Sequence, residues 1–261
     1  MAARKNTNEV AKREETLPVA LEELEAFSGQ GFEEADKDAF AIPFIRILQK
    51  LSPQLDKNEE AYIEGAEEGQ FFNTITGEIY GSEIDVIPVR YAREFIEWLP
   101  NRGGFKAAHG NDPSILDRVV SIDDKNNAIL DNGNIIQDTR NHFVLLAGKL
   151  EDGPVILSLA SSGIKHSRKW MSLMNNILIP NTKKKAPMFA GVWKLRTIRN
   201  SNDEGAWFMI GDKSVTAVEF ERWVTKEELD AALAAQDLLL SGKAEVNYDS
   251  LNEERSEAAP F

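Results

Sequence analysis

The longest apolar runs in this chain are only as long as a β-strand, and this limits the folds that it can adopt. Two such runs, His142 to Leu150 and Pro154 to Ala160, are joined by the turn sequence EDGP. A membrane-spanning helix needs about 20 apolar residues, which no run here approaches. The pattern therefore predicts a β-rich chain built from hairpins, without a membrane partner.

The expected helices are few and stand between groups of strands. One covers residues 17–27, one begins near Ser162 with Ser161 or Ser162 as its N-cap, and one covers residues 225–241. A hairpin is expected at FFNTITGEIYG, and a last antiparallel pair at residues 189–199 and 206–210. The glycine-rich sequence NRGGFKAAHGNDPS is expected to be a loop.

This order of elements favours a mainly β (α+β) fold. Strands with one helix inserted before the last strands are typical of the OB-fold, a five-stranded antiparallel barrel, here with flanking N- and C-terminal helices. Other α+β folds share the order. We expect a disordered N-terminus at residues 1–16, a single OB-like domain at 17–242, and a disordered acidic tail at 243–261.

Chemical motifs of common enzymes are missing from the sequence. The chain has no cysteine, which excludes disulfides, thiolate metal sites and cysteine nucleophiles. It has neither a GxxxxGK[ST] phosphate loop nor a GxSxG elbow. The histidines at positions 109, 142 and 166 are too far apart for a local metal motif. We expect a protein without enzymatic activity, cofactor or metal.

Acidic residues are absent from one long stretch, although the whole chain carries a formal net charge of −13. From Gly153 to Asn202 there is no Asp or Glu but nine Lys or Arg residues, so this acid-free stretch sums to +9 and the remainder to −22. Lys and Arg bind phosphates and release counterions, and nearby carboxylates would cancel that field. The segregation predicts a nucleic-acid partner, which the average charge would argue against.

The spacing of these cations predicts where they lie. Lys165, Arg168 and Lys169 are spaced as on one helix face, and Lys194 and Arg196 alternate along a strand. Aromatic rings stack on unpaired bases, which makes the interleaved tryptophans candidate platforms, although singly each is more often core. The DNA-binding residues expected in this stretch are Lys165, Arg168, Lys169, Trp170, Lys183, Lys184, Lys185, Trp193, Lys194, Arg196 and Arg199.

A second, weaker basic and aromatic patch lies upstream, around REFIEWLPNRGGFK. Its glycine-rich part is cationic, which suits an approach to a phosphate backbone. The residues expected to bind DNA here are Arg90, Arg93, Trp98, Arg102, Phe105 and Lys106.

The C-terminal residues combine acids with an aromatic end. The acids can occupy the protein's own basic groove, and a terminal aromatic with its carboxylate can dock on a partner. The residues expected to bind a protein partner are Glu253, Glu254, Glu257, Pro260 and Phe261.

This ending resembles the C-terminal tip of bacterial single-stranded DNA-binding proteins and the acidic, Phe-ending tail of podophage proteins with that function. Over residues 40–210 the body resembles phage single-stranded DNA-binding proteins in IPFIRILQKLSPQL, GQFFNTITGEIY, VIPVRYAREFIEWLP and SSGIKHSRKW. The resemblance implies an OB-fold core that coats single strands in phage replication, recombination and repair, in the host cytoplasm. It implies replication or recombination proteins as partners, and a homodimer stays open.

Two other functions fit the same residues. A phage structural or assembly protein would use the basic surface on capsid or packaged DNA, and a recombination protein would anneal complementary strands. A preference for single over double strands separates coating from assembly. Annealing needs the same groove as coating, so the sequence does not separate those two.

Overall fold

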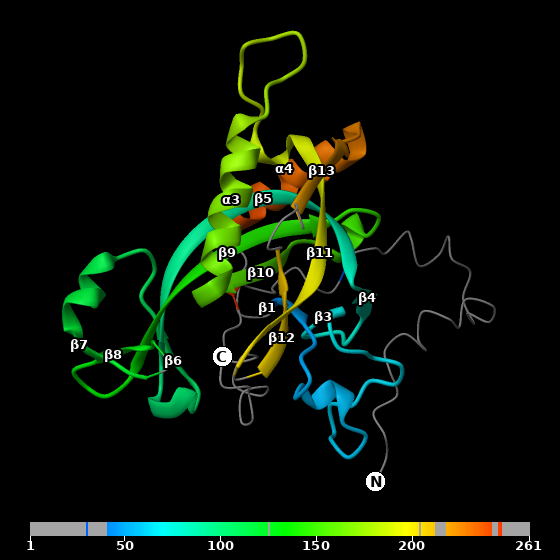
Figure 1. Cartoon of the computed structure of the whole chain (residues 1–261). Coiled ribbons are helices and arrows are strands. Elements are labelled where there is room, and N and C mark those ends of the chain that lie inside the picture. The colour runs from blue at the N-terminus through cyan, green and yellow to red at the C-terminus, as the bar shows by residue number, and fades with distance from the viewer. Residues whose placement is uncertain are drawn as a thin grey trace.

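A computed structural model describes residues 30, 41–124, 126–203, 205–211, 218–241 and 245–246. Within them the protein is mainly antiparallel β-structure with two α-helices (Figure 1). This confirms the β-rich fold class. The helix expected at residues 17–27 and the tail beyond residue 246 lie outside the described residues, whereas residues 245 and 246 form a short strand inside the segment expected to be disordered.

The elements are numbered in chain order. The helices are α3 (Ile164–Asn176) and α4 (Lys226–Leu240). The strands are β1 (Ala41–Ile42), β2 (Ile45–Ile47), β3 (Phe71–Asn73), β4 (Ile79–Gly81), β5 (Glu83–Trp98), β6 (Phe105–Ala108), β7 (Val119–Ile122), β8 (Ala128–Leu130), β9 (Ile135–Leu146), β10 (Val155–Ala160), β11 (Gly191–Asn202), β12 (Gly205–Ile210), β13 (Val218–Trp223) and β14 (Glu245–Val246).

The described strands form one large sheet and two small ones. The large sheet has nine strands in the order β12-β11-β5-β9-β8-β7, with β10 beside β9, β13 beside β11 and β6 beside β5. The small sheets are β2-β3-β4 and the parallel pair β1-β14. The ends of the large sheet do not pair with each other, so the expected closed five-stranded barrel is not observed.

Strand β5 bends the large sheet. It pairs with β9 along most of its length and arches across the molecule (Figure 1). The register shifts between Pro88 and Arg90, and a proline within a strand is tolerated at such a bulge because it donates no ladder hydrogen bond. The bulge accounts for the bend and gives the sheet a concave side.

The two helices cover different core clusters of the large sheet. Helix α4 buries Ala232, Ala235 and Leu239 in the cluster that contains Ile87 and Phe143. Helix α3 buries Trp170 and Met174 in the other main cluster, with Trp193 and Leu195 of β11 among others. This packing determines which side of each helix faces solvent.

Strands β6, β7 and β8 form a lobe at one end of β5 and β9 (Figure 1). Here the expected loop at residues 101–114 is wrong in part, because Phe105–Ala108 pairs with the end of β5 as strand β6. Glu97 is buried in this lobe and accepts hydrogen bonds from the amides of Asn132 and Asn134 and from His109 Nε2. Burial alone would raise the pKa of Glu97, but these hydrogen bonds lower it to about 2.

Other local expectations are confirmed. The three predicted hairpins appear as β3-β4, β9-β10 and β11-β12. Helix α4 begins with a capping box in which Thr225 and Glu228 exchange hydrogen bonds with each other's backbone N–H. The N-cap of α3 differs from the expectation, because it is Gly163 and neither Ser161 nor Ser162 caps the helix.

Candidate nucleic-acid interface

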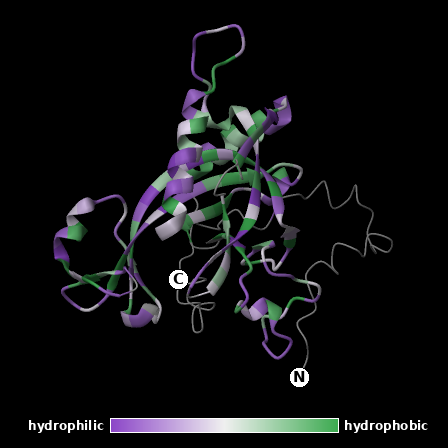
Figure 2. Ribbon diagram, viewed as in Figure 1, coloured by the Kyte–Doolittle hydropathy of each residue, from purple (hydrophilic) through white to green (hydrophobic). Residues whose placement is uncertain are grey.

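The cations on α3 lie together on its exposed face. Lys165, Arg168 and Lys169 are all exposed, while Trp170 and Met174 point into the core on the opposite side. Within the described part of the chain, none of the three forms an ion pair. Figure 2 shows the α3 ribbon as largely hydrophilic. The helix therefore presents a concentrated positive face to solvent.

The loop after α3 extends this surface. Lys183, Lys184 and Lys185 are exposed on a loop that protrudes beyond the helix (Figure 1). Lys185 Nζ donates to Asn175 Oδ1 at 3.1 Å, which ties the loop to the last turn of α3. We call these three lysines and the three cations of the α3 face the basic track.

The cations of β11 have a different environment. Lys194 Nζ lies 2.6 Å from an Asp85 oxygen, and Arg196 contacts Glu83 at 2.8 Å and Glu219 at 3.0 Å. Hydrogen bonds to these carboxylates raise the pKa of Lys194 and of Arg196. Both cations therefore have carboxylate partners, because strands β5 and β13 bring acids beside a stretch that has none of its own, and their contact with DNA stays a prediction. Arg199, farther along β11, is exposed.

The upstream patch is also largely occupied. Arg93 donates to both oxygens of Asp138 at 3.0 and 2.8 Å and stacks on Phe95, and Arg90 donates to the Leu239 carbonyl oxygen at 2.8 Å. Phe105 packs edge-on against Trp98.

Lys106 is exposed on β6, in the lobe, and the side chain of Arg102 is outside the described part. Two arginines of the upstream patch thus already have partners within the protein, and DNA binding by this patch stays a prediction.

The three tryptophans expected to stack on bases are core residues. Trp98, Trp170 and Trp193 are each no more than 2% exposed. Trp170 stacks on the ring of His142, with centroids 4.7 Å apart, and meets Trp193 edge-on at 6.4 Å. This corrects their predicted role, because a base could not reach these rings without opening the core.

The side chain of His142 is buried. Burial lowers its pKa to about 3, and its Nε2 contacts Ser167 Oγ at 2.8 Å. No cluster of three or more His, Asp or Glu side chains suited to a metal occurs in the described ranges. Neither described helix is long and apolar enough to cross a bilayer. The partner-binding residues Glu253, Glu254, Glu257, Pro260 and Phe261 lie outside the described residues.

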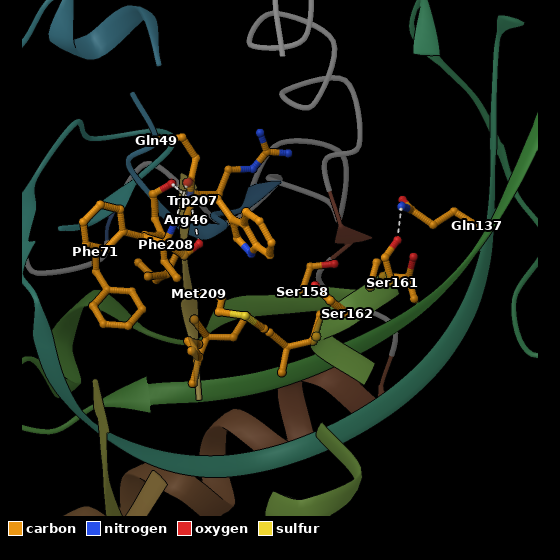
Figure 3. A pocket seen from close by; sticks show the side chains of 18 of the residues that line it. Arg46, Gln49, Phe71, Gln137, Ser158, Ser161, Ser162, Trp207, Phe208 and Met209 are labelled. Atoms are coloured by element: carbon orange, nitrogen blue, oxygen red, sulfur yellow. Dashed lines mark hydrogen bonds between the residues drawn. The ribbon is translucent and has the colours of Figure 1, made fainter. Parts of the chain in front are cut away.

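A cavity of about 510 Å³ opens where α3 begins. Its walls come from β2, β3, β9, β10 and β12 and the ends of β5 and β11, and they include Ser161, Ser162 and Gly163, which directly precede the helix. Figure 3 shows Trp207 beside Arg46 on one side, and Ser158, Ser161 and Ser162 on the other. The cavity and the basic track are therefore neighbours.

Strand β12 is held in place at the cavity by a side chain. Gln49 Nε2 donates to the Phe208 carbonyl oxygen at 2.9 Å, and the Phe208 N–H donates to Gln49 Oε1 at 2.8 Å. The Phe208 ring covers Gly69, where a Cβ would lie 2.6 Å from the ring. Glycine is needed at this position for close packing, and its φ of +84° independently favours glycine.

Comparison with protein families gives one result. The family model for the Pam3 phage gp34-like protein matches residues 11–245. The chain belongs to the Pam3 phage gp34-like family. No curated protein and no solved structure matched it. The match supports the phage part of the sequence resemblance, while DNA binding stays a prediction.

In this gp34-like chain, sequence reasoning missed the residues of the cavity, above all Arg46 and Trp207. Arg46 had a detectable signal, because it is the one charged residue in the apolar sequence FAIPFIRIL. Trp207 had a weaker one, since it stands near the start of the strand that follows the turn NSNDEG. Their proximity could not be foreseen, because it depends on the pairing of Gln49 with Phe208.

Proposed function

We propose that this chain binds single-stranded DNA without sequence preference and coats it during phage DNA replication, recombination and repair. The observation that carries the proposal is the basic track. Its six exposed cations form no ion pair within the described part of the chain, so each is available to a phosphate. Arg199 lies on the same acid-free stretch and is a further candidate contact.

The choice of single strands rests on the sequence, which resembles phage single-stranded DNA-binding proteins. The proposal does not need the closed OB barrel that the resemblance implied, since the track lies on a helix and a loop.

The test compares two pairs of cations from the same acid-free stretch. Binding of a labelled oligothymidine to the full chain is measured by fluorescence anisotropy from about 50 to about 200 mM salt. In R168A/K169A, the slope of log K against log salt should become shallower by about 1.4, because each phosphate contact to a single strand contributes about 0.7. The control K194A/R196A removes two cations that already have carboxylate partners, and its slope should match the parent.

Two results would contradict the proposal. One is a salt slope that R168A/K169A leaves unchanged. The other is a duplex of equal length bound as tightly as the oligothymidine, which would favour an assembly role on packaged DNA instead.

The acidic C-terminal residues are proposed to compete with DNA for the basic surface and to recruit replication or recombination proteins. Strand β14 pairs in parallel with β1, which puts Val246 beside Ile42, three residues before Ile45 of the cavity wall. Deleting residues 251–261 should tighten oligothymidine binding at low salt and weaken partner capture. Weaker DNA binding by the truncated chain would overturn the competition.

A further inference from the structure

The loop after α3 is a closed hairpin, which we call the finger (residues 177–186), and it protrudes beyond the helix (Figure 1). The Ile179 N–H donates to the Lys184 carbonyl oxygen at 2.9 Å. Leu178 forms an antiparallel bridge with Lys185. These contacts hold the two sides of the hairpin together, so the side chains on the finger have defined places.

Two large apolar side chains are exposed on the finger. Leu178 is 51% exposed and Ile179 is 37% exposed. In an antiparallel pair, residues opposite each other point to the same face, and neighbours along one strand point to opposite faces. Each apolar side chain therefore has a lysine on its own face of the hairpin, which is Lys185 for Leu178 and Lys184 for Ile179.

The charge around these apolar side chains has one sign. The finger contains no Asp or Glu, and its three lysines are exposed. Figure 2 shows a hydrophobic and a hydrophilic part of this loop. Lysines attract phosphates, and several DNA-binding proteins insert leucine or isoleucine between adjacent bases while cations hold the backbone. A nucleic-acid strand offers both partners, because its phosphates lie beside a stack of apolar base faces.

Leu178 is the better placed of the two side chains. It is the more exposed, and Lys185 opposite it donates to Asn175 Oδ1 in the last turn of α3. This hydrogen bond fixes the base of the finger relative to the helix. A strand whose phosphates follow the exposed cations of α3 toward the C-terminal end of the helix would meet Leu178 next.

We propose that the finger inserts the Leu178 side chain between two adjacent bases of the bound strand and thereby unstacks them. The inference rests on the proposed function, and it adds a contact with the bases to the contacts with phosphates. An aliphatic side chain forms no hydrogen bond with a base edge, so the insertion agrees with binding that has no sequence preference.

The experiment follows base stacking directly. 2-Aminopurine is an adenine analogue whose emission is quenched when it stacks, and an oligonucleotide of alternating adenine and 2-aminopurine reports every step. Emission should rise when the full chain binds this strand. In L178S most of the rise should be lost, while the salt slope should match the parent because all cations remain. The matched control V120S removes a 67% exposed apolar side chain from β7, in the lobe, and should behave as the parent.

Two further variants separate insertion from charge. L178M keeps a long apolar side chain and should keep most of the rise. L178K adds a cation at the same place, so the salt slope should steepen by about 0.7 if it contacts a phosphate, but the rise should be lost. L178S should also bind oligothymidine up to roughly tenfold more weakly, because less apolar area is removed from water.

The outcomes separate this inference from the proposed function. If the parent binds no oligonucleotide, the proposed function fails. If the parent binds with the expected salt dependence, but L178S gives the same rise in emission as the parent, only the insertion is overturned. A rise that L178K retains would also overturn it, because the finger would then act through its charge alone.

Discussion

The basic face of α3 and the cations of β11 come from the same acid-free stretch, yet they differ in space. Lys165, Arg168 and Lys169 face solvent without a carboxylate partner in the described structure. Lys194 and Arg196 face acids that strands β5 and β13 supply. Charge segregation along a chain is therefore not charge segregation on a surface. A helix on the outside of a sheet presents the charges of its own residues to solvent. The side chains of a central strand lie beside those of neighbouring strands, whose opposite charges can pair with them.

The largest expected effect comes from removing the contact between α3 and β11. Trp170 of α3 meets Trp193 of β11 and stacks on His142. Because such a buried ring contributes much of a core, W170A should lower the free energy of unfolding by about 3–5 kcal/mol. Urea unfolding followed by circular dichroism measures this. W223A, at a 38% exposed ring, should cost clearly less, and equal losses would show that α3 is not held through Trp170.

The buried Glu97 differs from the cations of both regions, because its carboxylate accepts hydrogen bonds from two neutral amides and a histidine. The folded-state pKa of Glu97 is about 2, below the ordinary value of 4.5 for a glutamate, so its contribution to stability is present above pH 4.5 and is lost as pH falls toward 2. By linkage, this contribution is up to about 3 kcal/mol. In urea unfolding, E97Q should be less stable than the parent at pH 7, and the difference should shrink in acid. A constant difference would contradict this, and E59Q, at an exposed acid, is the control.

The smallest expected effect comes from removing the acids beside Arg196, which would leave this β11 cation without carboxylate partners, like the cations of α3. In E83Q/E219Q, Arg196 loses both carboxylate partners while its side chain keeps its place on the strand. Exposed ion pairs stabilise a fold only slightly, so the free energy of unfolding should stay close to that of the parent. The salt slope of oligothymidine binding should steepen by about 0.7, corresponding to one more phosphate contact. A steeper slope would show that the paired acids mask Arg196 in the parent. An unchanged slope would show that β11 lies away from the bound DNA.

What the sequence predicted correctly is local. The hairpin β9-β10 and the capping box at Thr225 depend on residues a few positions apart, and both are observed. The errors come from distant pairings. Strand β13 was not foreseen, and it carries Glu219 to Arg196. The three tryptophans were assigned from their cationic neighbours, but their burial depends on how α3 and β5 pack. The cavity depends on the contact between Gln49, which follows β2, and Phe208 of β12, 159 residues away in the sequence.

The side chain of Gln49 forms the hydrogen bonds with strand β12 that a neighbouring strand would otherwise form. Phe208 uses its outward N–H and carbonyl oxygen on one amide, so the edge of β12 is closed at this residue. An open edge with apolar side chains is a template for further chains and a common route to aggregation. In the proposed function, neighbouring copies lie close together along DNA, and such an edge lets them do so without joining their sheets.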